Sequence, residues 1–230
     1  MPIDPERIRK NLASVRTRIE NVCAKSGRTN ASVMLVAVTK TVDLPEVRVL
    51  NSLGIKNFGE NRVHELARKA VALSSLGATW HMIGHLQRNK AKDLLPHSRI
   101  LHSLESPALA EVLSQRAAGM ALEVEVLIEV NTSGEETKDG LAPGAVEVLA
   151  ERIVSLPGLR LRGLMTMAPI AADAEKVRPV FAALRELAGT LGRNLPGGAM
   201  SELSMGMSQD FEIAIEEGAT MVRIGSALFV

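Results

Sequence analysis

Eight short runs of apolar and β-branched residues recur along this chain, and segments with helical periodicity lie between most of them. Strands that alternate with helices are typical of a parallel sheet joined by crossover helices. Eight such units favour a closed (β/α)8 barrel of the TIM type, whereas fewer would favour an open, doubly wound sheet. The expected strands are 33–38, 55–58, 80–83, 99–102, 124–130, 159–165, 200–204 and 220–224, and the expected helices are 44–53, 60–73, 107–117, 144–154, 174–191 and 210–216.

The length of the chain suits one barrel domain spanning residues 1–230, since such barrels typically need ~250 residues. Ahead of the first strand, residues 5–25 predict an additional helix with one apolar stripe. We expect residues 1–28 to form an amino-terminal helix that packs on the barrel. Only SALFV follows the glycine after the eighth strand, so this helix is expected to cover the place of a usual last helix. The stripe consists of Ile8, Leu12, Val15, Ile19 and Val22.

Composition and charge describe an ordinary globular protein without a general attraction to polyanions. Hydrophobic residues make up 46% of the chain, and 27 basic residues face 26 acidic ones, so the net charge is +1. There are four Phe, one Trp and no Tyr, which argues against nucleic-acid binding by base stacking and excludes a tyrosine acid or base. No apolar run reaches the ~18 residues of a membrane span, and the amino terminus lacks the apolar segment of an export signal. With Cys23 as the single cysteine, we expect a cytoplasmic protein that binds neither nucleic acid nor membrane.

One lysine, Lys40, directly follows the apolar run of the first expected strand. The carboxyl ends of barrel strands form the working face of this fold. Apolar walls behind the amine would lower the pKa of such a lysine and favour its nucleophilic free base, which forms Schiff bases with aldehydes. The alternative is a solvated lysine that simply ends a strand.

Small residues follow the last two expected strands. Gly225 and Ser226 come directly after the eighth strand, and the sequence SMGMS, which begins at Ser204, ends the seventh. Phosphate sites in these barrels commonly use the loops after strands seven and eight, where backbone N–H groups and hydroxyls point at the anion. Each pair alone is also compatible with an ordinary strand-to-helix turn, but together they favour phosphate recognition.

Arg223 and the histidines leave several interpretations open. Arg223 and Gly225 project to the same side of the eighth strand, and an inward arginine needs a partner, either a carboxylate or the ring nitrogen or oxygen of a ligand. The spacing of His81 and His85 resembles some zinc helices, but residues 80–83 predict a strand, so we expect no metal site. His81 is interpreted as a hydrogen-bonded residue of the core or of a pocket.

The motifs at the strand ends resemble those of the pyridoxal phosphate homeostasis proteins, the YggS/PROSC family, over nearly the whole chain. The shared motifs are AVTK (37–40), FGENRVHE (58–65), WHMIGHLQRNK (80–90), VNTSGEETKDG (130–140), GLMTMAP (163–169), LSMGMSQDF (203–211) and VRIGSALF (222–229).

The resemblance implies a free-standing barrel of the alanine racemase N-terminal domain type that holds pyridoxal 5′-phosphate (PLP), the vitamin B6 cofactor. It makes Lys40 the Schiff-base residue. Arg223 would face the pyridine nitrogen and keep it unprotonated, which weakens the cofactor as an electron sink. Ser204, Gly225 and Ser226 would bind the phosphate, and Asn61 and His81 would be pocket neighbours.

The implied function is PLP homeostasis, in which a monomer binds and buffers this reactive aldehyde and hands it to apo-enzymes, without substrate turnover. Lys138, in the SGEETKDG loop, is a hypothetical second aldehyde site. One alternative is a PLP-dependent amino-acid racemase with Lys40 as base. Two-base racemization needs a second group, which in alanine racemase is a tyrosine from another domain, and this chain has no tyrosine. A further alternative is a cofactor-free Schiff-base aldolase, which would be colourless when purified.

Overall fold

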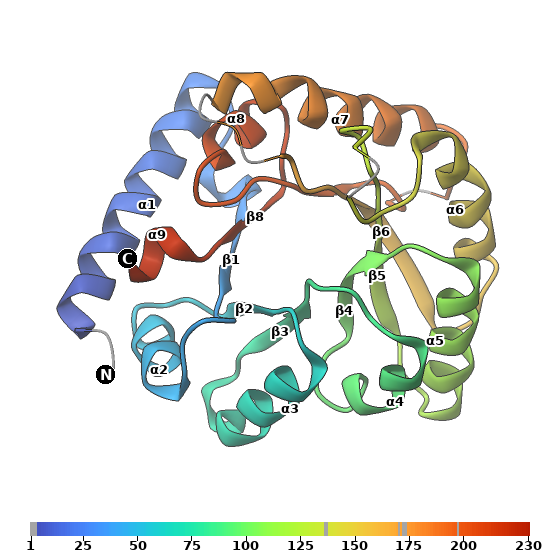
Figure 1. The fold of residues 1–230 in the computed structure, drawn as a ribbon, viewed down its shortest axis with the longest axis horizontal. Coiled ribbons are helices and arrows are strands. Elements are labelled where there is room, and N and C mark those ends of the chain that lie inside the picture. The colour runs from blue at the N-terminus through green and yellow to red at the C-terminus, as the bar shows by residue number, and fades with distance from the viewer. Residues whose placement is uncertain (1–3, 136–137, 170, 172–173, 197) are drawn as a thin grey trace.

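Eight parallel strands close into a barrel in chain order in the computed structural model, which describes residues 4–135, 138–169, 171, 174–196 and 198–230 (Figure 1). Each strand pairs with the next, and the eighth pairs with the first. The predicted (β/α)8 barrel is therefore confirmed. The strands are β1 (Met34–Val38), β2 (Asn57–Glu60), β3 (Thr79–Met82), β4 (Ile100–Leu104), β5 (Val124–Glu129), β6 (Leu159–Met165), β7 (Glu202–Ser204) and β8 (Met221–Ile224).

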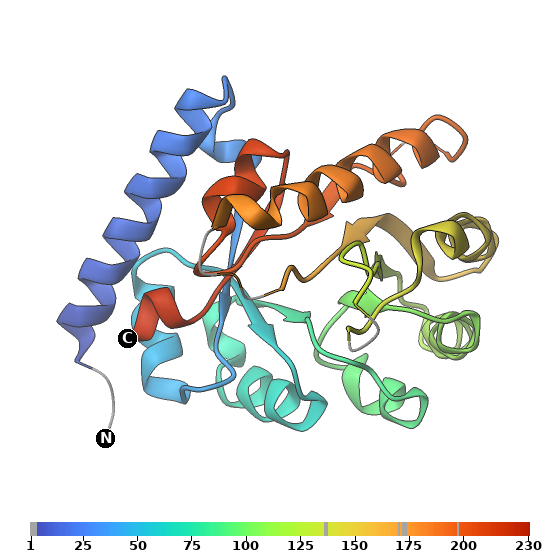
Figure 2. The same cartoon turned by 45° about the horizontal axis from the view of Figure 1, so that its top comes forward.

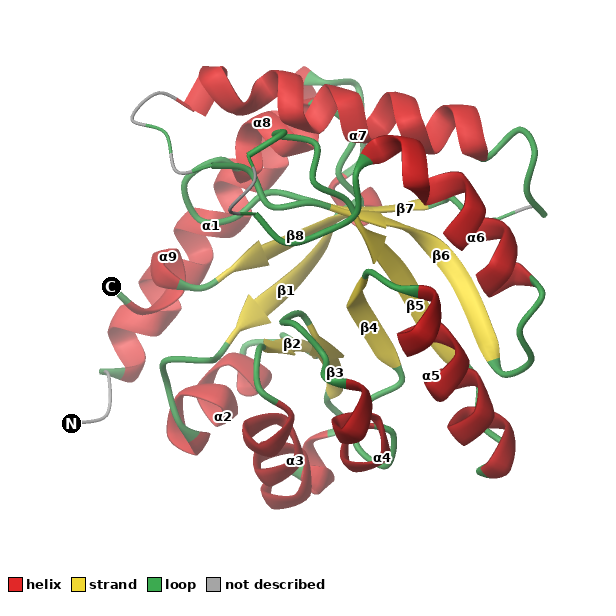
Figure 3. Cartoon of the chain, turned by 45° about the vertical axis from the view of Figure 1, so that its right-hand side comes forward, coloured by secondary structure: helices red, strands yellow, loops and turns green. Residues whose placement is uncertain are grey.

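Helices surround the ring of strands on its outer side (Figure 3). Two of them, α4 and α9, were not predicted, because four residues are too few to show a helical period. Short 3₁₀ turns lie at residues 30–32, 74–76, 88–90, 143–145 and 174–177. The helices are α1 (Pro5–Lys25), α2 (Leu44–Ser52), α3 (Val63–Ala72), α4 (Ala91–Leu94), α5 (Pro107–Gly119), α6 (Val146–Val154), α7 (Arg178–Leu191), α8 (Phe211–Glu216) and α9 (Ser226–Phe229).

The amino-terminal helix α1 has the predicted bounds and buries the predicted apolar stripe. The side chain of Asp4 caps its start by accepting a hydrogen bond from the Glu6 amide at 3.0 Å. Figures 1 and 2 show α1 running beside α8 and α9, so the two ends of the chain are neighbours. Asn11 donates to the carbonyls of Leu228 and Val230 at 3.2 and 3.1 Å. The helix thus packs on the outer side of the barrel beside α8 and α9, in the place of a usual last helix, although residues 1–3 lie outside the described part of the chain.

Polar side chains fill much of the barrel interior, while apolar side chains face the helices. At the amino-terminal end of the strands, Arg162 donates to Glu125 at 2.7 Å and to Glu202 at 3.0 Å, which joins β5, β6 and β7. The strand β2 differs from the predicted 55–58 run, since it begins at Asn57 and continues through the charged Glu60. Glu60 is fully buried between the sheet and α3, where it pairs with Lys69, and no apolar pattern reveals such a pair.

Candidate functional site

Lys40 lies where the sequence predicted, two residues beyond the end of β1. Val36 and Val38 are buried in the barrel, and Lys40 lies in the turn that follows β1, which the Val42 amide closes by donating to the Thr39 carbonyl at 3.1 Å. A Cβ on Gly225 would lie 3.5 Å from the Cβ of Val38, so β1 and β8 end side by side. Lys40 itself is exposed and makes no hydrogen bond or ion pair with any residue that the structure describes.

The loop after β7 meets the residues after β8 at one hydroxyl group. The Ser208 Oγ accepts hydrogen bonds from the amides of Gly225 and Ala227, both at 3.2 Å. The Asp210 carboxylate holds this loop by accepting from the Met207 amide at 2.6 Å. The two small-residue segments singled out in the sequence therefore form one cradle of backbone N–H groups and hydroxyls.

A glycine is required within this loop. Gly206 has φ of +90°, and a Cβ there would lie only 2.5 Å from the Ala214 Cβ. The loop after β7 can therefore approach α8 this closely only without a side chain at position 206.

Ser204 does not belong to this cradle. Its side chain is fully buried in the barrel, and its Oγ accepts from Arg223 Nη1 at 2.6 Å and contacts His102 Nδ1 at 2.8 Å. The geometry therefore does not favour Ser204 as a phosphate ligand. Ser208 is the hydroxyl that the sequence interpretation missed, although it lies four residues further along the same SMGMS motif.

A chain of hydrogen bonds crosses the barrel interior from Arg223 to Asn57. The Asn57 carbonyl oxygen at one end can only accept and Arg223 at the other can only donate, so with neutral rings each group between them donates towards Asn57, and the Ser204 proton points to His102 Nδ1. His102 then carries its proton on Nε2 and donates to His81 Nδ1 at 2.9 Å. His81 in turn donates from Nε2 to the Asn57 carbonyl oxygen at 3.2 Å. Both histidines are therefore inferred to be the tautomer that carries its proton on Nε2.

Burial lowers the pKa values of the two histidines in this series of hydrogen bonds. Burial lowers the pKa of His81 to about 4 and that of His102 well below its usual value, so both rings are neutral at pH 7. His81 is fully buried with both ring nitrogens bonded, and it reaches Arg223 only through His102 and Ser204. His81 is therefore the hydrogen-bonded interior residue that the sequence analysis allowed, and its place as a neighbour of a ligand stays a prediction.

Arg223 is a buried cation without a hydrogen-bonded carboxylate among the described residues. Its Nη1 donates to the carbonyl and hydroxyl of Ser204, and its Nη2 donates to the Thr166 carbonyl at 3.0 Å. Burial lowers the pKa of Arg223 to about 10, which leaves it protonated at pH 7. Its Nε–H and one Nη2–H have no partner in the described part of the chain, so they are available to a ligand.

Glu129, at the end of β5, is a titratable group that the sequence interpretation missed. Its side chain is 3% exposed and makes no hydrogen bond or ion pair with a described residue. Burial, assisted by the negative charges of Glu105 and Asp139, raises the pKa of Glu129 to about 7, against an opposing effect of Arg223. The two-residue alternation of β5, which also turns Leu127 inward, is the signal that would have identified it.

Asn61 and Lys138 lie in loops at the carboxyl ends of the strands. Asn61 is exposed after β2, and a Cβ on Gly84 would lie 2.5 Å from the Asn61 carbonyl oxygen, so the loops after β2 and β3 touch. Lys138 is half-buried in the loop after β5, where its amide donates to the Glu135 carbonyl at 3.1 Å. Residues 136–137 of this loop lie outside the described part.

Four neighbouring strands bring the remaining predicted residues and Ser208 to one sector of the mouth. In the closed barrel, β7, β8, β1 and β2 are adjacent, and each contributes one part of the mouth. This sector of the mouth contains an amine, an amide, two hydroxyls and backbone N–H groups. These belong to Lys40, Asn61, Ser208, Gly225 and Ser226.

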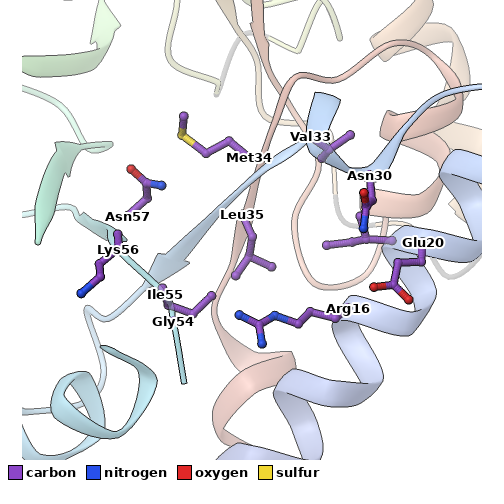
Figure 4. Close-up of a pocket in the computed structure, with 11 residues that line it drawn as sticks. Arg16, Glu20, Asn30, Val33, Met34, Leu35, Gly54, Ile55, Lys56 and Asn57 are labelled. Carbon is purple, nitrogen blue, oxygen red and sulfur yellow. The ribbon is translucent and has the colours of Figure 1, made fainter. Parts of the chain in front are cut away.

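A cavity of about 370 Å³ lies at the opposite end of β1, between the barrel and α1 (Figure 4). Its walls include Arg16 and Glu20 of α1 and Asn57 at the start of β2. This cavity is therefore separate from the mouth that holds Lys40. Within the described residues, no cluster of three or more His, Cys, Asp or Glu side chains could hold a metal ion, and no helix is long and apolar enough to cross a membrane.

Comparison with known proteins identifies close relatives along the whole chain. The family model for the alanine racemase N-terminal domain matches residues 3–230. A pyridoxal phosphate homeostasis protein from Aquifex aeolicus is 44% identical over 96% of both chains, and one from Pseudomonas aeruginosa is 43% identical over 96% of this chain and 94% of its own. The structure of PipY from Synechococcus elongatus with PLP bound is 34% identical, with a TM-score of 0.86 over 97% of this chain and 100% of PipY.

Proposed function

Because the chain belongs to the pyridoxal phosphate homeostasis protein family, whose single barrel is an alanine racemase N-terminal domain, we propose that it binds PLP and takes part in PLP homeostasis. The observation that carries this proposal is the unpartnered Lys40 amine beside an N–H and hydroxyl cradle at one sector of the mouth. PLP offers the two groups that this sector suits, an aldehyde and a phosphate. The PLP-bound structure of PipY supports the same assignment.

The cradle fits a phosphate group. The amides of Gly225 and Ala227 converge on the Ser208 hydroxyl, and the exposed Ser226 adds a second hydroxyl after β8. Backbone N–H groups and hydroxyls in such a concave arrangement bind anions without needing a lysine or arginine. We assign the phosphate to Ser208, Gly225 and Ser226, and Ser204 to the support of Arg223.

Lys40 would hold the cofactor covalently. Its amine nitrogen adds to the aldehyde carbon and one water molecule leaves, which gives a Schiff base that hydrolysis reverses. Asn61, on the adjoining strand β2, would be a neighbour of the bound cofactor.

Arg223 would face the pyridine nitrogen with its two free N–H groups. Because the guanidinium stays protonated and can only donate, a ring nitrogen in front of it remains unprotonated. An unprotonated ring is a weak electron sink, so the cofactor would not support broad carbanion chemistry there. His81 contributes indirectly, through His102 and Ser204.

We assign this chain a binding role without substrate turnover. The chain has no tyrosine to supply the second base of a racemase. The single domain of residues 1–230 would act as a cytoplasmic monomer that buffers PLP and hands it to apo-enzymes. The buried, unpaired Cys23 accords with a reducing compartment.

The test is an absorption spectrum of the purified protein with added PLP, followed by borohydride reduction and peptide mapping. We expect Schiff-base absorbance and a reduced adduct on Lys40, both lost in Lys40→Ala and both retained in Lys56→Ala, a lysine near the other end of the barrel. An adduct only on other lysines would overturn the assignment of Lys40, and an adduct on Lys138 in addition would identify a second aldehyde site. A colourless protein without any adduct would instead favour the cofactor-free aldolase.

A further inference from the structure

Lys69 is the one lysine that is buried among the described residues. It lies on the inner face of α3 with Val63 and Leu66, and its side chain is 1% exposed. An ammonium group in a protein interior carries a large desolvation cost unless its donors are all satisfied. Its surroundings therefore need a specific explanation.

The three donors of this ammonium group each have a partner. Nζ donates to Glu60 Oε1 at 2.6 Å, to the Thr39 carbonyl at 2.8 Å and to the Val42 carbonyl at 2.8 Å. The two carbonyls stand on either side of residues 40–41. One buried cation on α3 thus holds both ends of the turn that carries Lys40.

Glu60 strengthens the same attachment from the sheet. The Thr39 hydroxyl donates to Glu60 Oε1 at 2.6 Å, and the Val42 amide donates to the Thr39 carbonyl at 3.1 Å, closing the turn. Thr39 is therefore held through its side chain and its carbonyl at once. The turn after β1 is fixed to β2 and α3 before any ligand arrives.

We infer that Lys69 is a positioning residue, which fixes the turn of residues 39–42 so that the Lys40 amine emerges beside the cradle at the end of β8. This inference rests on the proposed function, because it gives the Lys40 amine the task of meeting an aldehyde. A displacement of about 1 Å at a reacting group lowers rates by up to ~100-fold, so the rigidity of this turn affects how quickly the amine reacts.

The ion pair of Lys69 and Glu60 does not have the geometry expected of a pair that serves stability alone. Glu60 Oε2 is buried and has no hydrogen-bond partner among the described residues. Buried ion pairs can often be replaced by apolar residues of similar volume with little loss of stability, so the pair is weak evidence for a role in stability alone. An apolar replacement supplies no donor to join the Thr39 and Val42 carbonyls.

The test uses the double variant Lys69→Met with Glu60→Gln, which removes both charges but leaves glutamine to accept from Thr39. The control is Lys56→Met, since Lys56 also donates to a backbone carbonyl, that of Leu76 at 3.2 Å, away from the mouth. The first readout is amide hydrogen exchange at residues 40–42 in ligand-free protein. The second is the rate at which added PLP forms a borohydride-trapped adduct on Lys40, and the third is the thermal midpoint.

We expect the double variant to unfold cooperatively near the wild-type midpoint, to exchange its Val42 amide at least tenfold faster and to form the Lys40 adduct at least tenfold more slowly. The control should match the wild type. Exchange and adduct rates within twofold of the wild type would overturn the inference.

Failure of the proposed function gives a different result. Wild-type protein would then form no adduct on Lys40, and hydrogen exchange of the turn alone would decide whether Lys69 fixes it. If the double variant does not fold, Lys69→Gln is the second variant, because its shorter side chain offers two N–H donors for the three partners of Lys69. Faster exchange of the Val42 amide in this variant would support the inference, and unchanged exchange would overturn it.

Discussion

Replacing Glu129 by glutamine should stabilise the protein above neutral pH and leave its stability unchanged near pH 4. Glu129 is buried, with 3% of the residue exposed, and its carboxyl group has no hydrogen-bond partner among the described residues. Its burial therefore penalises the charged form, and glutamine resembles the neutral form in size and shape. The effect of the substitution should depend on pH for this reason.

The sign and size follow from the pKa of Glu129, which is raised from 4.5 to about 7 in the folded protein. Below pH 4.5 the group is neutral in both the folded and unfolded states and contributes nothing. Between pH 4.5 and 7 the unfolded chain has released this proton and the folded protein has not, so the free energy of unfolding falls as the pH rises. The total loss above pH 7 is at most about 3 kcal/mol, at 1.36 kcal/mol for each unit of pKa.

The buried histidines act in the opposite direction over a similar range. The pKa of His81 is lowered to about 4 and that of His102 is also lowered. Below pH 6.5 these histidines are therefore protonated in the unfolded chain while they stay neutral in the folded protein. Stability from this source rises between pH 4 and 6.5. The two effects partly cancel in the wild type, and Glu129→Gln should expose the rising slope of the histidines.

Urea unfolding of wild type and Glu129→Gln at pH 4.5, 6 and 8 checks this reasoning. The free energy of unfolding of the variant should exceed that of the wild type by an amount that grows from pH 4.5 to pH 6 to pH 8. The difference should reach about 3 kcal/mol at pH 8. The control is Glu123→Gln, since the Glu123 side chain is 64% exposed and should show no such trend. A difference between Glu129→Gln and wild type that is the same at pH 4.5 and 8, or a less stable variant at pH 8, would refute the argument.

Three further predictions concern the cradle and the interior. Ser208→Ala should weaken binding of PLP about tenfold, because one hydrogen bond to a charged group is lost. Binding of pyridoxal, which lacks the phosphate, should be unchanged. Spectroscopic titrations with both compounds decide this. Nitrogen NMR at pH 6 should find His81 and His102 neutral and protonated on Nε2, and a doubly protonated ring would contradict the inferred order of donors. Gly206→Ala should lower the free energy of unfolding by about 1–3 kcal/mol, because its φ of +90° and the 2.5 Å approach to Ala214 leave no room for a Cβ; unchanged urea unfolding would show that the loop can move.

The barrel could be predicted because its outer surface follows simple periodic patterns. Strand residues that face the helices are apolar, and helices such as α1 and α7 carry an apolar stripe, so alternation along the chain identifies the elements. The error at β2 has a physical cause. Glu60 faces the helices as apolar strand residues do, but its charge is neutralised by Lys69, which lies nine residues further along the chain.

The depth of each side chain in the barrel could not be predicted from local patterns. Ser204 and Ser208 share one short motif, yet Ser204 ends a strand and points into the sealed interior, whereas Ser208 lies in the loop above it. Likewise His81 and His102 lie 21 residues apart, and the parallel pairing of β3 with β4 brings His81 Nδ1 to 2.9 Å from His102 Nε2. The sequence identified which residues follow the carboxyl ends of the strands. The structure was needed to tell which of their side chains lie at the mouth and which lie inside the barrel.

The order of donors in the interior limits the chemistry available at the mouth. Protons on Ser204, His102 and His81 all point away from Arg223, towards Asn57, because both rings are neutral and the Asn57 carbonyl oxygen at the end of these hydrogen bonds can only accept. None of these groups can therefore pass a proton through Arg223 to a ring nitrogen of a ligand. Under the proposed function, such a barrel would hold PLP on Lys40 with a ring that is a poor electron sink, which would favour storage and release of PLP over turnover.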